Sequence, residues 1–207
     1  MPSLEEPTSR LAALESYVRS ELAYLPANLT FHNADHTLDL ELGVVARTRY
    51  YCQAEGVCAA DTELATAAAY LHDIGHTLQS KDHEKIGAAI AAGVLPQYGY
   101  DSHDVRTIKR LVLATLIPTH PVDLLEQIIC DADVDNLGRA DFFEKTHALQ
   151  AEMGVKDRQA WYLGTYAFMQ NHQYYTATAR AERDRGKQNN VKLLAERIEH
   201  YGRPPPA

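Results

Sequence analysis

Apolar residues recur at helical spacing along most of the chain, and no stretch alternates with the two-residue period of a half-buried strand. The first helix that this spacing predicts is capped by Thr8 or Ser9 and ends near Pro26. Its apolar face carries Leu11, Leu14, Val18, Leu22 and Leu25. The pattern therefore predicts an all-α chain.

Two helices follow in the most apolar part of the sequence. The first is expected from Asn33, as its N-cap, through Val44 toward Gly56. The second begins near Asp61 and includes residues 65–71, a run rich in alanine. Because small side chains allow close packing, this second helix is predicted to be central and buried.

The rest of the chain is expected to be helical as well. Helices are predicted over 82–95, 102–115, 121–131, 140–153, 157–183 and 187–200, with turns at Pro96, Gly99, Pro118 and Pro121. The aromatic residues of the segment 157–183 are interpreted as core rather than as a platform for stacking a base; they are Trp161, Tyr162, Tyr166 and Phe168.

Composition narrows the classes of partner. The 207 residues are 45% hydrophobic, enough for a buried core, and carry a formal net charge of −8 with no dense block of Lys or Arg. A long nucleic acid is therefore not expected as a partner. The three cysteines lack paired spacing, and neither a signal core nor a membrane-length apolar run is found, so the chain is predicted to be cytoplasmic with no membrane partner.

The dipeptide His72-Asp73 ends the buried helix and offers two ligand types for a divalent cation. Adjacent helical residues point about 100° apart, so both can reach one ion only beside the seam between them. A buried carboxylate here needs a cation or several donors to offset its lost hydration. By itself, the dipeptide more often marks a polar helix end that faces water.

Two flanking segments change that interpretation. Residues 31–37, Phe-His-Asn-Ala-Asp-His-Thr, lie at a predicted helix start and place His36 one turn into the helix. Residues 128–138 contain three carboxylates, Asp131, Asp133 and Asp135, directly after an apolar helix. That helix should anchor the acidic cluster in the core rather than leave it in water.

Together, these three segments resemble the HD superfamily of metal-dependent phosphohydrolases, whose pattern is H…HD…D on a bundle of helices. The resemblance covers residues 31–138, and its Phe-His-Asn-x-x-His entry is also similar to the catalytic domain of cyclic-nucleotide phosphodiesterases. It implies a metal held by His36, His72, Asp73 and Asp133. Asp133 is preferred over Asp131 because Ala-Asp-Val-Asp-Asn best matches the family's Ala-Asp-x-x-Asp/Asn run.

The resemblance also implies a domain plan. Residues 1–30 are expected to form an N-terminal helix packed on the core, 31–138 the metal-binding core, 139–200 the helices that complete the same domain, and 201–207 a flexible tail. Residues 139–143 and 171–176 are similar to a bacterial subgroup of HD proteins of poorly defined activity. This likeness supports a single-domain helical bundle of the HD and phosphodiesterase type but no particular substrate.

Catalytic roles follow from the same resemblance. Asp73 is expected to be both a ligand and a proton acceptor. His32 is a candidate for the leaving-group acid, with a structural hydrogen bond as the alternative. His76 is a candidate catalytic group or a polar neighbour of the ligands. Substrate phosphate is expected to contact His83, Lys81 or Arg139, with Lys109 and Arg110 as further cations that more often are plain surface charges.

Two histidines and two carboxylates suit Mn, Fe, Co, Ni, Zn or Mg as the divalent ion. One ion is predicted. Some two-metal HD proteins have a ligand at a position similar to His83, but they need another imidazole, which only His120 would supply here. His120 lies between Thr119 and Pro121, where proline favours an extended backbone and takes it off a helix face.

The sequence therefore predicts a metal-dependent phosphohydrolase that acts on a small phosphate ester, with a nucleotide as the expected substrate. The alternatives are a phosphodiesterase for cyclic or linear nucleotides and a non-catalytic protein that binds metal and nucleotide to regulate a partner. A homodimer is compatible with the sequence.

Overall fold

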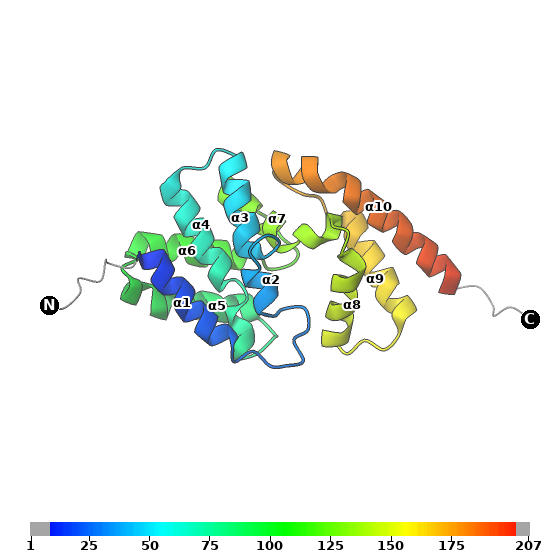
Figure 1. Cartoon of the computed structure of the whole chain (residues 1–207), viewed down its shortest axis with the longest axis horizontal. Coiled ribbons are helices and arrows are strands. Elements are labelled where there is room, and N and C mark those ends of the chain that lie inside the picture. Colours follow the sequence, from blue (N-terminus) through cyan, green and yellow to red (C-terminus); the bar gives the residue numbers. More distant parts are fainter. Residues whose placement is uncertain (1–8, 202–207) are drawn as a thin grey trace, which may run out of the picture.

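The computed structural model describes residues 9–201, and every regular element in that range is helical (Figure 1). The α-helices are α1 (Arg10–Leu22), α2 (Ala34–Leu38), α3 (Val44–Ala54), α4 (Ala59–Leu71), α5 (His83–Val94), α6 (Ser102–Ala114), α7 (Leu124–Asp133), α8 (Phe142–Glu152), α9 (Arg158–Asn171) and α10 (Ala177–Tyr201). Short 3-10 helices are η1 (Ile74–Thr77), η2 (Leu95–Tyr98) and η3 (Asp135–Gly138). The all-α prediction is confirmed. The predicted cap Thr8 and nearly all of the predicted tail lie outside the described residues.

Helix α4 is the centre of the core. Every residue from Leu64 to Leu71 is buried, and α4 packs against α1, α3, α6 and α7. The alanines of this stretch let the neighbouring helices approach closely, as the sequence predicts. The surrounding apolar faces carry residues of no exposure, including Leu14, Ile108 and Ile129. The end of α4, where His72 follows, is therefore held firmly by the core on several sides.

The helix predicted from Asn33 toward Gly56 is wrong in one respect, because it is two helices, α2 and α3. The carboxylate of Asp39 accepts hydrogen bonds from the backbone N–H groups of Glu41 and Leu42, which closes a turn between them. Gly43 allows that turn, since a Cβ at this position would lie 2.6 Å from the backbone nitrogen of Asp39. Asn33 does cap α2, accepting from the N–H of His36.

The boundary predicted between the last two helices, 157–183 and 187–200, is also wrong. The break lies at residues 172–176, where Thr176 caps the 25-residue helix α10, and Gly186 lies within that helix. The glycine is explained by a close approach, because a Cβ there would lie 2.0 Å from the carbonyl oxygen of Gly138 in η3. Gly186 thus serves packing rather than helix termination.

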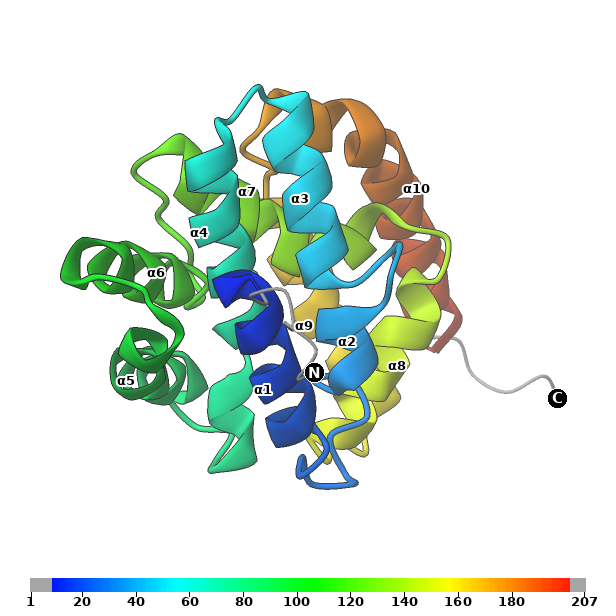
Figure 2. The same cartoon turned by 60° about the vertical axis from the view of Figure 1, so that its left-hand side comes forward.

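Helices α8, α9 and α10 stand beside the α1–α7 bundle, and α10 crosses back toward α3 (Figure 1). The second view shows α2 between the central helices and α8 (Figure 2). None of the helices within residues 9–201 combines the length and apolarity needed to cross a bilayer. The segments with candidate chemistry, namely α2, the end of α4 and the end of α7, meet on the side that faces α8.

Candidate metal centre

The structure brings together the four residues expected to hold a metal. His36 lies in α2, His72 and Asp73 follow α4, and Asp133 is the last residue of α7. His72 is fully buried, and its Nδ1 donates to the carbonyl oxygen of Ala69 at 2.9 Å. That hydrogen bond directs the other ring nitrogen, Nε2, toward the cluster, where it would ligate a bound cation after losing its proton.

The ligand atoms of this cluster are spaced for a single ion. His72 Nε2 lies 3.2 Å from Asp73 Oδ2 and 3.5 Å from both His36 Nε2 and Asp133 Oδ1. His36 Nε2 lies 3.2 Å from Asp133 Oδ1 and 3.5 Å from Asp73 Oδ2. Ligands about 2.0–2.2 Å from one ion, at angles of about 90–110°, lie roughly 2.8–3.6 Å apart. The five distances fall inside that range.

The charges of the cluster also favour a cation. Burial opposes ionisation of Asp133, yet hydrogen bonds from His36 and His72 hold its pKa well below the usual range. Burial likewise opposes a charge on His72, but the carboxylates of Asp73 and Asp133 raise its pKa well above the ordinary value. Asp73 Oδ2 is buried and makes no hydrogen bond of acceptable geometry. A buried carboxylate oxygen without a hydrogen bond, set among imidazole and carboxylate ligands, is the pattern expected where a divalent ion binds.

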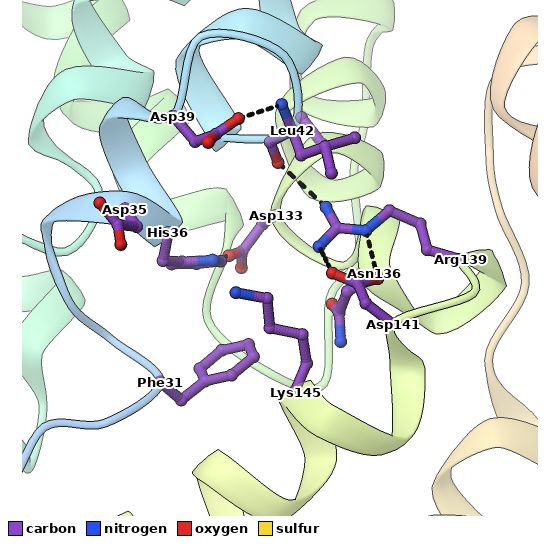
Figure 3. A pocket seen from close by; sticks show the side chains of 11 residues that line it. Phe31, Asp35, His36, Asp39, Leu42, Asp133, Asn136, Arg139, Asp141 and Lys145 are labelled. Atoms are coloured by element: carbon purple, nitrogen blue, oxygen red, sulfur yellow. Dashed lines mark hydrogen bonds and ion pairs between the residues drawn. The ribbon is translucent and has the colours of Figure 1, made fainter.

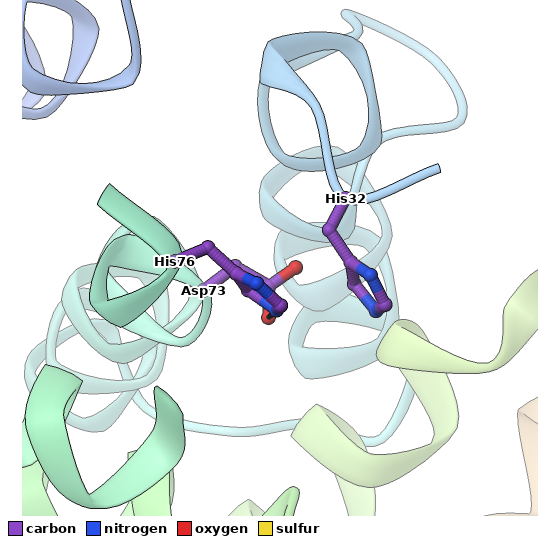
Figure 4. Close-up of side chains that lie close together, drawn as sticks. All are labelled: His32, Asp73 and His76. Atoms are coloured by element: carbon purple, nitrogen blue, oxygen red, sulfur yellow. Dashed lines mark ion pairs between the residues drawn. The ribbon is translucent and has the colours of Figure 1, made fainter. Parts of the chain in front are cut away.

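A second group of imidazoles faces the other oxygen of Asp73. His83 Nε2 lies 3.3 Å from Asp73 Oδ1, and His76 Nε2 lies 4.0 Å from it. The rings of His76 and His83 stack with centroids 3.9 Å apart, and the ring of His32 stacks on His76 at 4.5 Å. Figure 4 shows His32 and His76 directed toward the same space beside Asp73. His76 Nε2 is buried without a hydrogen bond.

The electrostatic environment shifts the pKa values of these imidazoles in opposite directions. Burial, together with repulsion from a charge on His32 or His83, lowers the pKa of His76 to about 4 and keeps its ring neutral. Burial opposes a charge on His32 and His83 too, but Asp73 raises the pKa of both. The group therefore contains one imidazole suited to act as a ligand or base and two suited to carry a proton.

Glu152, at the end of α8, is a site residue that the sequence does not reveal. One of its oxygens pairs with His32 Nδ1, and the other accepts from the backbone N–H groups of Phe31 and His32 at 2.9 and 3.0 Å. This carboxylate fixes the ring of His32 with Nε2 toward the cluster. Because 120 residues separate the partners, no local pattern could have indicated the pairing.

Lys145 of α8 is the second residue that sequence reasoning missed. It lines a polar cavity of about 130 Å³ that also includes His36, Asp133 and Arg139. Figure 3 shows its amine directed toward His36 and Asp133. Among the residues that the structure describes, the amine has neither a hydrogen-bond partner nor a carboxylate within ion-pair distance. A half-buried free ammonium group beside a metal cluster is suited to bind an anion.

The cations predicted to contact phosphate are less well placed. The Arg139 guanidinium is bound to both oxygens of Asp141, at 2.9 and 2.6 Å, and donates to the carbonyl oxygen of Leu42, so three of its five N–H donors are already used (Figure 3). Lys81 is exposed on the loop before α5 and lines neither cavity beside the cluster. Arg110 pairs with Glu126. Of the predicted phosphate ligands, His83 contacts Asp73 of the cluster, and Arg139 lines the polar cavity beside it.

Asp131 and His120 both lie outside the ligand cluster. Asp131 is fully buried and accepts three hydrogen bonds, from the N–H of Tyr175 and from the N–H and hydroxyl of Thr176, each at 2.8 Å. It therefore ties residues 172–176 to α7 and lies outside the ligand cluster. His120 is exposed and belongs to neither imidazole group.

Comparison with known proteins agrees with this geometry. The family model of the HD domain matches residues 40–136, and this stretch of the chain is a domain of the HD superfamily. Members of this superfamily are generally metal-dependent hydrolases, although some are not catalytic. The match begins after His36, so the structure alone places that side chain at the cluster. No curated protein and no solved structure gives a significant match.

Proposed function

We propose that this chain is a divalent-metal-dependent hydrolase of small phosphate esters. The observation that carries the proposal is the meeting of His36, His72, Asp73 and Asp133 at distances suited to one ion, with Asp73 Oδ2 left without a hydrogen bond. A divalent cation held there would lower the pKa of a coordinated water and neutralise charge on a phosphoryl group.

The chain's own residues supply the remaining parts. Asp73 has its Oδ2 toward the ligand cluster and its Oδ1 toward the imidazoles, so it can accept a proton from an attacking water beside the cluster. Protonated His32, oriented by Glu152, can donate a proton to the leaving oxygen. Lys145 can bind a phosphate oxygen from the polar cavity. Lys145 lines the polar cavity together with His36 and Asp133, and His32 lies beside Asp73, so the acid, the base and the cation all adjoin the ligand cluster. A non-catalytic binding site would not require that arrangement.

We still predict one bound ion per chain, but the argument from the sequence for that number does not hold in the structure. It depended on His120 being the only second imidazole available to His83. The structure instead places His76 and His83 together at Asp73 Oδ1. If one ion binds, wild type and His83→Ala should each hold one ion per chain. Two ions in the wild type, falling to one in the variant, would contradict the prediction.

A metal analysis followed by a screen of phosphate esters tests the function. The metal-replete protein should contain bound metal, and Mn, Fe, Co, Ni, Zn and Mg should be compared as activators of hydrolysis. His72→Ala should lose both metal and turnover, whereas His120→Ala, which removes an exposed imidazole, should keep both. Lys145→Ala should raise KM more than Lys145→Arg does, since only the second keeps a cation.

The outcomes separate the rival functions. Turnover of phosphodiesters but not monoesters would identify a phosphodiesterase, for which His32 could equally protonate the leaving alkoxide. Bound metal with no turnover of any ester, in the presence of every activator, would favour the regulatory protein. No metal in either wild type or His72→Ala would end the hydrolase proposal itself. The nucleotide substrate that the sequence predicts is tested in the same screen by nucleoside monophosphates, and a homodimer remains a proposal.

A further inference from the structure

An apolar cavity of about 550 Å³ opens between α8 and α9, directly beside the ligand cluster. Its walls include Phe142, Leu149, Met153, Trp161 and Phe168. The expectation that Trp161 and Phe168 are plain core residues is thus incomplete, because both present surface to this space. The volume is typical of sites for small organic ligands, which run from about 300 to 1,000 Å³.

The cavity is continuous with the candidate metal centre. Phe31, Asp133 and Asn136 line both this cavity and the polar one, and His32 lines the apolar cavity as well. A substrate phosphate bound between the ligand cluster and Lys145 would therefore lie next to both the polar and the apolar cavity. The polar cavity, with Lys145, suits the phosphate oxygens, and the apolar cavity suits what the phosphate is attached to.

Apart from His32, Asp133 and Asn136, at the end that adjoins the metal centre, the walls offer few free polar groups. The indole N–H of Trp161 donates to the Thr146 hydroxyl at 3.1 Å, and the Thr165 hydroxyl donates to the Trp161 carbonyl oxygen at 2.9 Å. No Lys or Arg lines the cavity. A nucleobase buries several donors and acceptors, and each one left unpaired costs binding free energy. A second phosphate would find no cation there.

We propose that this cavity is the subsite for the organic group of the substrate and that this group is an alkyl or aryl chain rather than a nucleoside. The inference rests on the proposed phosphohydrolase function and names its substrate class. His32 stands at the boundary, since it lines the apolar cavity and faces the cluster through Asp73. It is thus placed where the ester oxygen would leave with its apolar group.

Gly164 provides a direct way to fill the subsite. It lies in α9 and lines the cavity, and a Cβ added there would meet no heavy atom within 4 Å. Gly164→Leu therefore introduces an isobutyl group into open space and improves helix propensity, so the variant should fold. Gly93, in α5, is a matched control, because a Cβ there also meets nothing within 4 Å and the residue lines neither cavity.

The first test uses ethyl, butyl, hexyl and octyl phosphate with a nucleoside 5′-monophosphate. All have a primary alcohol as leaving group, so their intrinsic reactivity is similar. kcat/KM should rise roughly fourfold per added methylene until the cavity is filled, as expected if burial of each methylene contributes about 0.8 kcal/mol. Gly164→Leu should flatten that series, and Gly93→Leu should retain it. Preference for the nucleotide with a flat alkyl series would overturn the proposal.

The second test does not depend on turnover. Trp161 is the only tryptophan of the chain and lies in the cavity wall, so its fluorescence reports occupancy. Octylphosphonate, which cannot be hydrolysed, should shift the emission of metal-replete wild type and Gly93→Leu but not of Gly164→Leu. A shift without hydrolysis of any ester would support the subsite and defeat the hydrolase function. Hydrolysis with no shift and no chain-length dependence would defeat the subsite alone.

Discussion

Replacing Gly186 by alanine sets two effects of opposite sign against each other. Alanine is better than glycine in a helix interior by about 1 kcal/mol, and Gly186 lies inside α10. From local sequence alone, the change should stabilise the protein. The structure predicts the opposite, because α10 and η3 touch backbone to backbone at this residue.

The geometry sets the size of the loss. A Cβ at 186 would lie 2.0 Å from the oxygen and 3.0 Å from the carbon of the Gly138 carbonyl, so the two elements must separate by more than 1 Å. Arg183 and Asn190 hold η3 and its flanking residues on α10 through hydrogen bonds to the Asp135 carboxylate and the Leu137 carbonyl oxygen, which resist that movement. Overpacking costs about 1–3 kcal/mol, and a backbone neighbour places this case at the upper end. After subtracting the gain in propensity, the net loss is about 2 kcal/mol.

Urea unfolding followed by far-UV circular dichroism measures the effect, with Gly93→Ala as the matched control. Gly93 also lies in a helix but has open space at its Cβ, so alanine should stabilise the protein there by up to about 1 kcal/mol. Gly186→Ala should instead lower the free energy of unfolding by about 2 kcal/mol, which in a thermal melt of a chain of this size is a melting temperature roughly 4–8 °C lower. If both variants gain stability, the close approach of α10 to η3 is not a constraint and the packing argument fails.

Three further outcomes are expected. Asp131→Asn should lower the free energy of unfolding by about 1–3 kcal/mol, because it loses buried hydrogen bonds, yet retain its metal; Asp133→Asn should lose the metal, and the reverse ranking would contradict the assigned ligands. Gly75→Ala should reduce turnover while the fold persists, since its Cβ would lie 2.0 Å from the carbonyl oxygen of His83 and push that residue from the cluster; unchanged kinetics would refute this. Burial lowers the pKa of His172 to about 4, so the stability it contributes is complete above about pH 6.5 and is lost as the pH falls toward 4. Between pH 7 and pH 5, the free energy of unfolding of His172→Asn should therefore fall by roughly 1–2 kcal/mol less than that of wild type, as measured by denaturant titration. An equal fall in both proteins would exclude His172 as the cause.

The sequence was sufficient for the helical class and, through its resemblance to the HD superfamily, for naming four residues that the structure brings together. Apolar periodicity is a local signal, so α4 and its burial follow from residues 64–71 alone. Asn33 caps α2 as predicted, because capping depends on a side chain three residues from its partner. His72-Asp73 and Asp133 each end an apolar helix that the core must bury, and their resemblance to the H…HD…D pattern of the HD superfamily predicted that they meet.

Only the tertiary structure decided which distant side chains complete the site. Glu152 reaches His32 across 120 residues, and the free amine of Lys145 is recognised only once Arg139 is seen to be paired with Asp141. The same holds for Gly186, whose local signal suggests a helix break while its packing partner, Gly138, explains its presence inside α10. Pairings of this kind depend on how helices cross, and crossing geometry leaves no periodic trace in the sequence of either partner.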